Sequence, residues 1–305
     1  MTSGPPGRFG AVLTAMVTPF DDEGRLDLDG VAVLARWLVD NGSEGLVVAG
    51  TTGEAPVLTD GERQDLWRAV IEAVTVPVVA GAGTNDTAHS VEMAKAAADV
   101  GATAVLAVTP YYNRPSQAGI EGHFRAVAAA TDLPVVLYDI PVRSGRKIAH
   151  DTMLRLAREV PTIAAVKDAA GDVYGSARLI AEAPAGFELY SGDDGATLPL
   201  LSVGAVGTVG VATHWTGRLH ARMFEAFVKG DVEEARRINA AMLASFAFET
   251  GDDAPNPVPT KALLRVLGLP AGQCRLPMGP APDGLEARAR AVLAGLGEAA
   301  PAPHG

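Results

Sequence analysis

Cysteine is almost absent from this chain, since Cys274 is the only thiol among 305 residues. One thiol cannot form an internal disulfide bond, so a fold stapled by disulfides is excluded. A catalytic cysteine needs surroundings that lower its pKa, whereas Cys274 follows the Gly- and Pro-rich segment 270–273. We therefore interpret Cys274 as a structural residue. The six histidines are also scattered, with no HxH or HxxxH spacing, so we expect no metal site.

Long apolar runs and an excess of basic residues are missing as well. No uncharged apolar run approaches the roughly 18 residues of a membrane span, and residues 1–10 lack the apolar core of a signal peptide. The formal net charge is −11, whereas nucleic acids and anionic membranes select basic surfaces. We therefore expect a cytoplasmic protein that binds neither nucleic acid nor membrane.

The chain does contain a repeated alternation of short apolar runs and helix-like segments. Such short, Val-rich, mostly continuous runs are typical of strands that are covered on both faces. Eight of them are predicted as strands, at residues 11–17, 45–49, 76–80, 104–108, 134–139, 163–167, 187–191 and 206–211.

The segments between these runs carry signals for helix starts. Thr59 and Glu62 have the spacing of a capping box, in which each residue bonds the backbone of the other. Asp151 is expected to cap a helix over residues 153–159. After residue 220 only helical patterns follow, at 219–228, 232–248, 260–267 and 285–296.

Alternating strands and helices predict strands that pair in parallel through right-handed crossovers. At about 250 residues, a sheet of eight such strands closes into the (β/α)8 TIM barrel, an α/β fold. The alternative is an open doubly wound sheet, but the first strand is not followed by a GxGxxG turn. We predict a barrel over residues 9–225, a small C-terminal helical domain over 226–298, and flexible tails at 1–8 and 299–305.

Active sites of such barrels lie at the carboxyl ends of the strands, so the residues that follow each predicted strand are informative. Hydroxyl-bearing and charged residues gather there, in segments 50–54, 109–113, 138–143 and 191–194 and at Lys167. Asp193 and Asp194 belong to the last of these segments, and we interpret them as a solvated turn or a helix cap.

Lys167 is the most informative of these residues because it ends an apolar, presumptively buried strand. Burial disfavours the ammonium ion and lowers the pKa of a lysine. A neutral amine in a dry pocket attacks a carbonyl carbon and forms a Schiff base. The structural alternative is a lysine at a strand end that reaches water or pairs with Asp168.

The neighbouring candidates each have a structural alternative of the same kind. Thr51 and its glycine neighbours form either an ordinary turn or a backbone cradle for a carboxylate. Tyr138 is either a core tyrosine or a proton handle, and Arg143 is either a surface ion pair or an anion clamp. Their common placement around Lys167 favours enamine chemistry, which needs an amine, a proton shuttle and an anion clamp.

Seven motifs in this order and spacing resemble the dihydrodipicolinate synthase family, which includes N-acetylneuraminate lyase and keto-sugar-acid aldolases. The resemblance covers residues 9–297. The motifs are Gly-Thr-Thr-Gly-Glu at 50–54, Tyr-Tyr-Asn-Arg-Pro at 111–115, Tyr-Asp-Ile-Pro-Val-Arg-Ser-Gly at 138–145, Val-Lys-Asp at 166–168, Ser-Gly-Asp-Asp at 191–194, Asn-Pro-Val-Pro-Thr-Lys at 256–261 and Arg-Leu-Pro-Met at 275–278.

The resemblance implies a class I aldolase, a lyase that condenses pyruvate with aspartate 4-semialdehyde to 4-hydroxy-tetrahydrodipicolinate, for lysine and diaminopimelate biosynthesis. It implies a homotetramer, a dimer of dimers, without metal or organic cofactor. It also implies residue roles. Lys167 would form the Schiff base, and the backbone of Thr51 and Thr52 would hold the pyruvate carboxylate. Tyr138, Thr51 and Tyr112 would relay protons, with Tyr112 reaching in from a neighbouring subunit. Arg143 would bind the second substrate, and Gly192 and Val209 would lie near the substrate.

Some positions depart from the family pattern. Asp139 stands where Asn is common and Gly210 where Ser is common, and we expect neither to abolish the chemistry. The resemblance also implies a lysine effector site, whose positions here are Asn85, Tyr111, Asp60, Arg63 and His89. Asp60 and Arg63 replace two histidines and His89 replaces an acid, so we expect weak or absent inhibition by lysine.

Two other functions remain open at this stage. One is cleavage of a 2-keto sugar acid or an N-acetylneuraminate-type substrate with the same lysine. The other is a pyruvate-binding regulatory protein that has no turnover. A complete set of Lys167, Tyr138, Thr51, Tyr112 and Arg143 argues against the second, because a regulatory site has no need of a proton relay.

Overall fold

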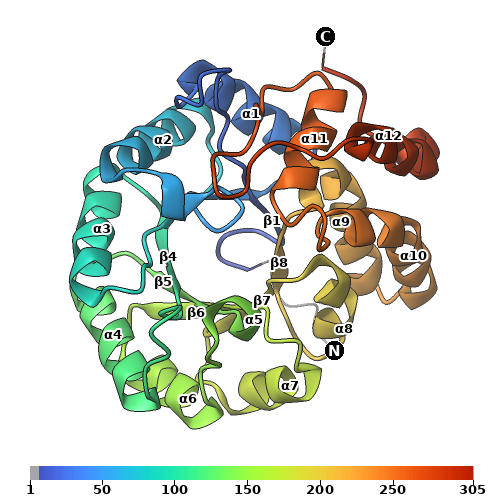
Figure 1. Ribbon diagram of the computed structural model, residues 1–305. Helices are drawn as coiled ribbons and strands as arrows, with labels where there is room; N and C mark the ends of the chain where they lie inside the picture. The colour runs from blue at the N-terminus through green and yellow to red at the C-terminus, as the bar shows by residue number, and fades with distance from the viewer. Residues whose placement is uncertain (1–6, 305) are drawn as a thin grey trace.

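The strands of the protein close into a barrel in a computed structural model that describes residues 7–304 (Figure 1). All eight strands pair in parallel with their sequence neighbours, and β1 pairs with β8. The strands are β1 (Val12–Ala15), β2 (Gly45–Val48), β3 (Val78–Gly81), β4 (Ala104–Val108), β5 (Val135–Asp139), β6 (Ile163–Asp168), β7 (Glu188–Ser191) and β8 (Gly207–Gly210). The predicted TIM barrel is therefore confirmed.

Helices surround the barrel and extend it at the carboxyl end of the chain (Figure 1). The α-helices are α1 (Leu28–Asp40), α2 (Asp60–Ala73), α3 (Thr87–Asp99), α4 (Gln117–Ala129), α5 (Pro141–Ser144), α6 (His150–Glu159), α7 (Val173–Glu182), α8 (Thr197–Ser202), α9 (Thr213–Val228), α10 (Val232–Phe248), α11 (Val258–Val266) and α12 (Leu285–Leu296). Short 3-10 turns lie at η1 (Ala55–Val57), η2 (Asp194–Ala196) and η3 (Gly297–Ala299).

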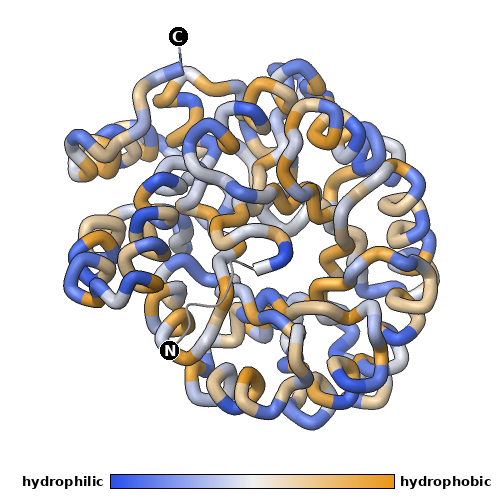
Figure 2. Tube along the Cα trace, turned by 180° about the vertical axis from the view of Figure 1, so that it is seen from behind, coloured by the Kyte–Doolittle hydropathy of each residue, from blue (hydrophilic) through white to orange (hydrophobic). Residues whose placement is uncertain are grey.

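Side-chain alternation along the strands divides the core into two parts, and Figure 2 shows the apolar stretches of the trace. One apolar cluster lies between strands and helices and includes Leu137 and Val166. A second cluster fills the barrel and includes Tyr138 and Ala165. Because neighbouring residues of a strand face opposite sides, Lys167 points into the barrel like Ala165. Alternation thus directs both a tyrosine and a lysine inward.

One predicted helix start is confirmed and another is wrong. The Thr59 side chain accepts a hydrogen bond from the Glu62 amide, and the Glu62 carboxylate accepts one from the Thr59 amide. In contrast, α6 begins at His150 with Ala149 as its N-cap, and Asp151 lies in the first turn. Acids are favoured at both positions, in the first turn because of the helix dipole, so a lone aspartate does not distinguish cap from first turn.

The C-terminal helices pack back onto the barrel. The predicted domain boundary at residue 225 lies inside α9, which runs on to Val228. The coil between α11 and α12 reaches α2, where Arg275 pairs with Glu62. The amide of His304 donates to the carbonyl of Leu267 at 2.7 Å. Residues 1–6 of the predicted N-terminal tail lie outside the described part of the chain, so the domain limits stay a prediction.

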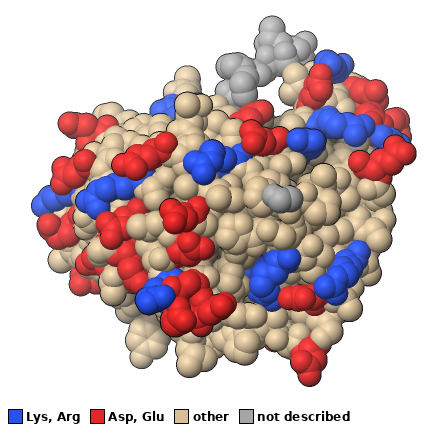
Figure 3. Space-filling model, turned by 90° about the horizontal axis from the view of Figure 1, so that it is seen from above, with Lys and Arg blue, Asp and Glu red and all other residues tan. Residues whose placement is uncertain are grey.

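Two surface features bear on possible partners. On the face shown in Figure 3, basic side chains are interspersed with acidic ones. Within residues 7–304, no helix has both the length and the apolar character that crossing a bilayer requires.

Candidate active site

A cavity of about 360 Å³ opens at the carboxyl ends of β2, β4 and β5. Its polar lining comes from hydroxyl groups and two guanidinium groups, while Leu106, Val108 and Ile140 supply apolar walls. The polar residues are Thr51, Tyr111, Tyr112, Tyr138, Ser144, Arg63 and Arg143. Four of the residues singled out from the sequence as catalytic or substrate-binding, Thr51, Tyr112, Tyr138 and Arg143, therefore meet around one space.

Lys167 lies beside this cavity rather than in its lining. Its side chain is buried, with 5% of the residue exposed, and its Nζ atom lies 4.3 Å from the centre of the Tyr138 ring. The two residues are partners in the register of β5 and β6. Burial lowers the pKa of Lys167 to about 8, and Arg143 acts in the same direction. The negative charges of Asp194 and Glu249 oppose this shift.

Tyr138 connects the lysine to the cavity. Burial raises the pKa of its phenol to about 12, while Arg143 and a hydrogen-bonding interaction with Thr51 oppose the rise. A protonated phenol at this position donates and accepts hydrogen bonds, which a proton shuttle requires. The hydroxyl groups of Thr51 and Tyr138 come from the ends of different strands, so the barrel itself sets their spacing.

The three remaining substrate-binding candidates lie deeper. Gly192 touches Lys167, because a Cβ atom on it would lie 3.0 Å from the Cγ atom of that lysine. Val209 is buried inside the barrel. The hydroxyl of Thr52 is buried and accepts a hydrogen bond of 3.0 Å from the amide group of Asn256. Asn256 lies in the C-terminal segment, and the sequence did not mark it as a site residue.

Backbone strain concentrates around the cavity. Ala49, Glu54, Tyr112 and Arg114 are the non-glycine residues with positive φ in residues 7–304, at values from 47° to 73°. Each costs about 1–3 kcal/mol and persists only where its surroundings hold it. Glu54 is held by an ion pair of 2.6 Å with Lys261, both side chains being buried. Strain that clusters in this way is typical of functional sites.

Tyr112 does not bury its ring within the chain. The residue is 89% exposed although it borders the cavity, and its φ of 73° directs the side chain outward. A large exposed aromatic ring beside a catalytic cavity fits a surface that another protein molecule covers.

Of the predicted effector residues, Arg63 and Tyr111 line the cavity. His89 pairs with Asp60 at 2.9 Å, and the backbone carbonyl of Asn85 accepts a hydrogen bond from Asn113. Arg63 is 4% exposed and donates from Nη2 to the carbonyl of Ala55. Its Nε and Nη1 atoms have no hydrogen-bond partner within residues 7–304. Burial lowers the pKa of Arg63, and Asp60 and Tyr111 oppose this effect.

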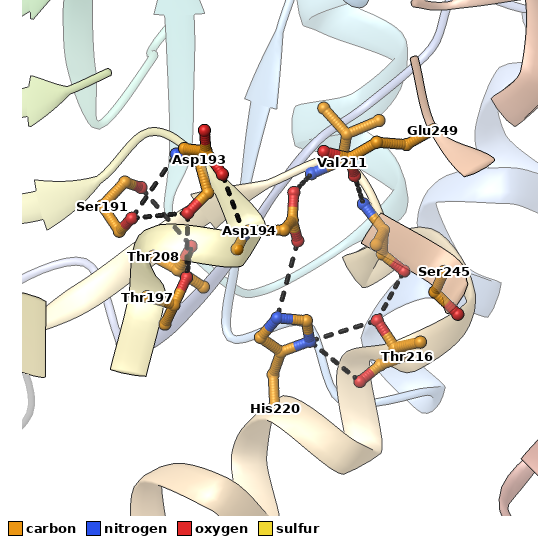
Figure 4. Close-up of polar contacts among 12 residues, drawn as sticks. Ser191, Asp193, Asp194, Thr197, Thr208, Val211, Thr216, His220, Ser245 and Glu249 are labelled. Atoms are coloured by element: carbon orange, nitrogen blue, oxygen red, sulfur yellow. Dashed lines mark hydrogen bonds and ion pairs between the residues drawn. The ribbon is translucent and has the colours of Figure 1, made fainter. Parts of the chain in front are cut away.

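One expectation about the strand ends was wrong. Asp193 caps η2, but Asp194 is only 1% exposed, so it does not belong to a solvated turn. Its carboxylate turns inward toward β8 and α9, where His220 and the residue that follows α10, Glu249, also lie (Figure 4). Glu249 and His220 carry no sequence signal because an acid at a helix end and a helical histidine are common on surfaces.

No group of three or more His, Cys, Asp or Glu side chains within residues 7–304 is arranged to hold a metal ion. Cys274 is buried, and burial raises the pKa of its thiol to about 12. A thiol in such a state is not a nucleophile.

Comparison with known proteins places this site in a family. The sequence profile of the Dihydrodipicolinate synthetase family matches residues 8–294. The chain belongs to this family. It is 50% identical over 300 residues to a 4-hydroxy-tetrahydrodipicolinate synthase of Acidothermus cellulolyticus, with 97% of this chain and 95% of that protein covered.

Solved structures of the family have the same fold. A dihydrodipicolinate synthase of Cyanidioschyzon merolae, solved with lysine bound, is 43% identical, with a TM-score of 0.92 and coverage of 95% of this chain and 99% of that chain. A structure described as the first monomeric dihydrodipicolinate synthase variant is 33% identical, with a TM-score of 0.90 and coverage of 94% and 96%. The barrel is therefore kept in a variant that is described as monomeric.

Proposed function

We propose that this protein is a 4-hydroxy-tetrahydrodipicolinate synthase, a lyase that joins pyruvate to aspartate 4-semialdehyde. The names of its relatives at about 50% identity support this activity. The single observation that carries it is the buried Nζ atom of Lys167, held beside the Tyr138 ring with a pKa of about 8. At that pKa about a tenth of the amine is unprotonated at pH 7, far more than for an ordinary lysine, and nucleophilic attack requires this form.

The first half of the reaction is imine formation at Lys167. The amine nitrogen forms a bond to the keto carbon of pyruvate, and the keto oxygen leaves as water. That oxygen takes one proton from the nitrogen and a second from a donor at the site, so an iminium ion results. The amides around Thr51 and Thr52 hold the pyruvate carboxylate, and the donor is the phenol of Tyr138, whose ring centre lies 4.3 Å from the amine.

The second half forms the carbon–carbon bond. Loss of a proton from the methyl group of bound pyruvate turns the iminium into an enamine, whose carbon attacks the aldehyde carbon. Tyr138, Thr51 and Tyr112 carry the protons, and the aldehyde oxygen takes one of them. Arg143 lies at the cavity wall, and its planar guanidinium suits the carboxylate of the second substrate. This chemistry changes no oxidation state through a cofactor, so we propose none.

A sugar-acid aldolase is the less favoured candidate. Its longer substrate has no second short carboxylate to match Arg143, and the relatives at about 50% identity have the synthase name. A silent pyruvate-binding protein would gain nothing from the strained Tyr112 or from the buried lysine.

We also propose that the working form is an oligomer, a homotetramer built as a dimer of dimers. The exposed ring of Tyr112 at the cavity edge supports a neighbouring subunit there. A monomeric family variant exists, so the assembly needs its own test. We place the protein in the cytoplasm, on its composition alone.

Borohydride reduction in the presence of pyruvate tests the proposed function. Reduction of an imine leaves a stable adduct, and peptide mapping is expected to find it on Lys167. Lys261 is the matched control because it is also buried but pairs with Glu54. The Lys167→Arg variant is expected to keep its fold and form no adduct. An adduct on another lysine, or no adduct, would contradict the mechanism. The substrate is decided by comparing turnover with aspartate semialdehyde and turnover with 2-keto sugar acids.

A further inference from the structure

A buried cluster near Lys167 contains two carboxyl groups, which cannot both be ionised inside the barrel. Asp194 and Glu249 accept hydrogen bonds from consecutive backbone amides, at 2.7 Å from Val211 and at 3.0 Å from Ala212. Their carboxyl groups therefore lie side by side (Figure 4). Burial and the charge of Asp194 raise the pKa of Glu249 well above its usual range. Two carboxylates in one buried site cannot both ionise without a large cost.

Position 210 makes room for this arrangement. A Cβ atom on Gly210 would overlap the Oδ1 atom of Asp194 and lie 2.7 Å from a methyl carbon of Thr213. A side chain at this position would have to displace the Asp194 carboxylate, so the inward turn of Asp194 depends on the glycine at position 210.

The hydrogen bonds of His220 show that a proton is required within the cluster. The Thr216 hydroxyl donates to the carbonyl of Ala212 at 2.7 Å, so its oxygen accepts on its other side. Nδ1 of His220 lies 3.1 Å from that hydroxyl and 3.1 Å from the Thr216 carbonyl, and it must donate to them. A neutral His220 then presents an unprotonated Nε2 to Oδ1 of Asp194, 3.5 Å away.

Neither Nε2 of His220 nor Oδ1 of Asp194 has a hydrogen-bond partner within residues 7–304. A nitrogen lone pair and a carboxylate oxygen repel each other unless a proton lies between them. Other charged or titratable groups that act on the cluster are Asp193, His214 and, through Lys167, Arg143. Burial lowers the pKa of His214 to about 4, so it adds no charge at neutral pH.

We propose that Asp194, Glu249 and His220 share a single proton, so that the cluster presents one net negative charge to the nitrogen of Lys167. The inference rests on the proposed imine chemistry. With two negative charges nearby, the amine would stay protonated and would not attack. With none, the positive iminium ion would lie uncompensated inside the barrel. Glu249 and His220 are thus positioning residues, and Glu249 comes from the C-terminal helices.

Amide substitutions test this charge count. The pH dependence of borohydride-trapped imine is measured for the Asp194→Asn, Glu249→Gln and double variants. Each single variant keeps one carboxyl group, which then ionises alone, so its midpoint is expected to move little. The double variant loses the charge, and its midpoint is expected to fall by about one pH unit. The proposal would be overturned if the two single variants shifted the midpoint equally and additively, or if the double variant did not shift it.

Glu188→Gln is the matched control, because Glu188 lies at the opposite end of β7 and bonds Arg8 and Tyr190. Its midpoint is expected to equal that of the unaltered protein. Thermal unfolding of each variant reports whether the fold survives.

Infrared spectroscopy tests the proton in the unaltered protein, so it does not depend on how the double variant folds. The spectrum is recorded at pH 8, where Asp139, with a pKa of about 6, is ionised. One band of a protonated carboxyl group is expected, and it disappears in each single variant. Absence of that band would refute the shared proton. A wild-type protein that forms no imine but shows the band would refute the proposed function instead.

Discussion

At the scale of single residues, Tyr138 is proposed to carry protons without holding the barrel together. The Tyr138→Phe variant removes one hydroxyl from a buried ring, so we expect a stability loss of no more than about 1.5 kcal/mol. Turnover is expected to fall by about 100-fold or more, since the proposed proton donor beside the imine is gone.

The matched control is Tyr190→Phe in strand β7, two strands away around the barrel. The hydroxyl of Tyr190 accepts from the Phe9 amide and donates to Glu188, away from the cavity. Its loss is expected to lower stability and leave turnover near normal. Equal turnover in the two variants, measured under saturating substrate, would remove Tyr138 from the mechanism.

Asp139 is a second residue whose surroundings determine its pKa and its effect on stability. Burial raises its pKa to about 6 from an ordinary value of 3.8, although Lys147 lies 3.6 Å away and opposes the rise. Between about pH 4 and pH 6 the folded protein binds a proton that the unfolded chain releases, so stability falls as the pH rises through this window.

The Asp139→Asn variant keeps an acceptor for the Ile148 amide, which lies 3.1 Å from Oδ1. Asparagine has no proton to lose, so the variant is expected to be more stable than the wild type at pH 7, by about 1–3 kcal/mol. At pH 4 the two are expected to unfold together in urea. A constant difference at both pH values would show that packing rather than ionisation is responsible.

At the scale of elements, the N-terminus of α2 is joined to the C-terminal coil by one carboxylate. Glu62 accepts from the Thr59 amide at 2.8 Å and from Arg275 at 3.0 Å. Arg275 also lies over the ring of Phe20, 4.3 Å from its centre. Hydrogen bonding with Arg275 is the main reason that the pKa of Glu62 falls to about 2. This contribution to stability is present above the ordinary pKa of 4.5 and is lost as the pH falls toward 2.

The Glu62→Gln variant therefore tests how firmly the coil is attached. It is expected to be less stable by about 1–3 kcal/mol at pH 7, with the difference shrinking below pH 4. Glu234→Gln is the control, because Glu234 pairs with Arg237 at the exposed surface of α10. The control is expected to change the unfolding midpoint far less. A pH-independent loss in Glu62→Gln would argue against the ion pair.

We propose that an effector would bind at the junction of α2 and α3, where the charges are unsuited to an ammonium group. The carboxylate of Asp60 is already paired with His89, and Arg63 adds a buried positive charge. We expect lysine at sub-millimolar concentration to leave at least half of the activity. Initial rates measured against lysine test this, and half-inhibition below a millimolar would show that another acid receives the ammonium.

At the scale of the whole molecule, the barrel was predictable but the completion of its site was not. Eight apolar runs and their spacing predict the strands, and strand alternation places Lys167 and Tyr138 inside. In contrast, Asn256 and Thr52 are 204 positions apart, and no local pattern joins them. The same holds for Glu249 and Asp194. The C-terminal helices therefore belong to the working unit, although their sequence suggests an appendage.

The last property of the whole molecule is whether each site needs a second subunit. If Tyr112 acts in the site of its neighbour, a subunit with Lys167→Ala still supplies its tyrosine, and one with Tyr112→Phe still supplies its lysine. In random two-fold pairing, half of the dimers are mixed and each has one complete site of two, so about a quarter of wild-type activity is expected in the unseparated mixture and about half in the purified mixed dimer.

The two variants are produced together with different affinity tags, and the mixed species is purified through both. Each homogeneous variant is the control and is expected to be nearly inactive. If Tyr112 acts within its own subunit, every site in the mixed species lacks one of the two groups, and no activity returns. Recovery therefore follows from a shared site and cannot arise from a self-sufficient one.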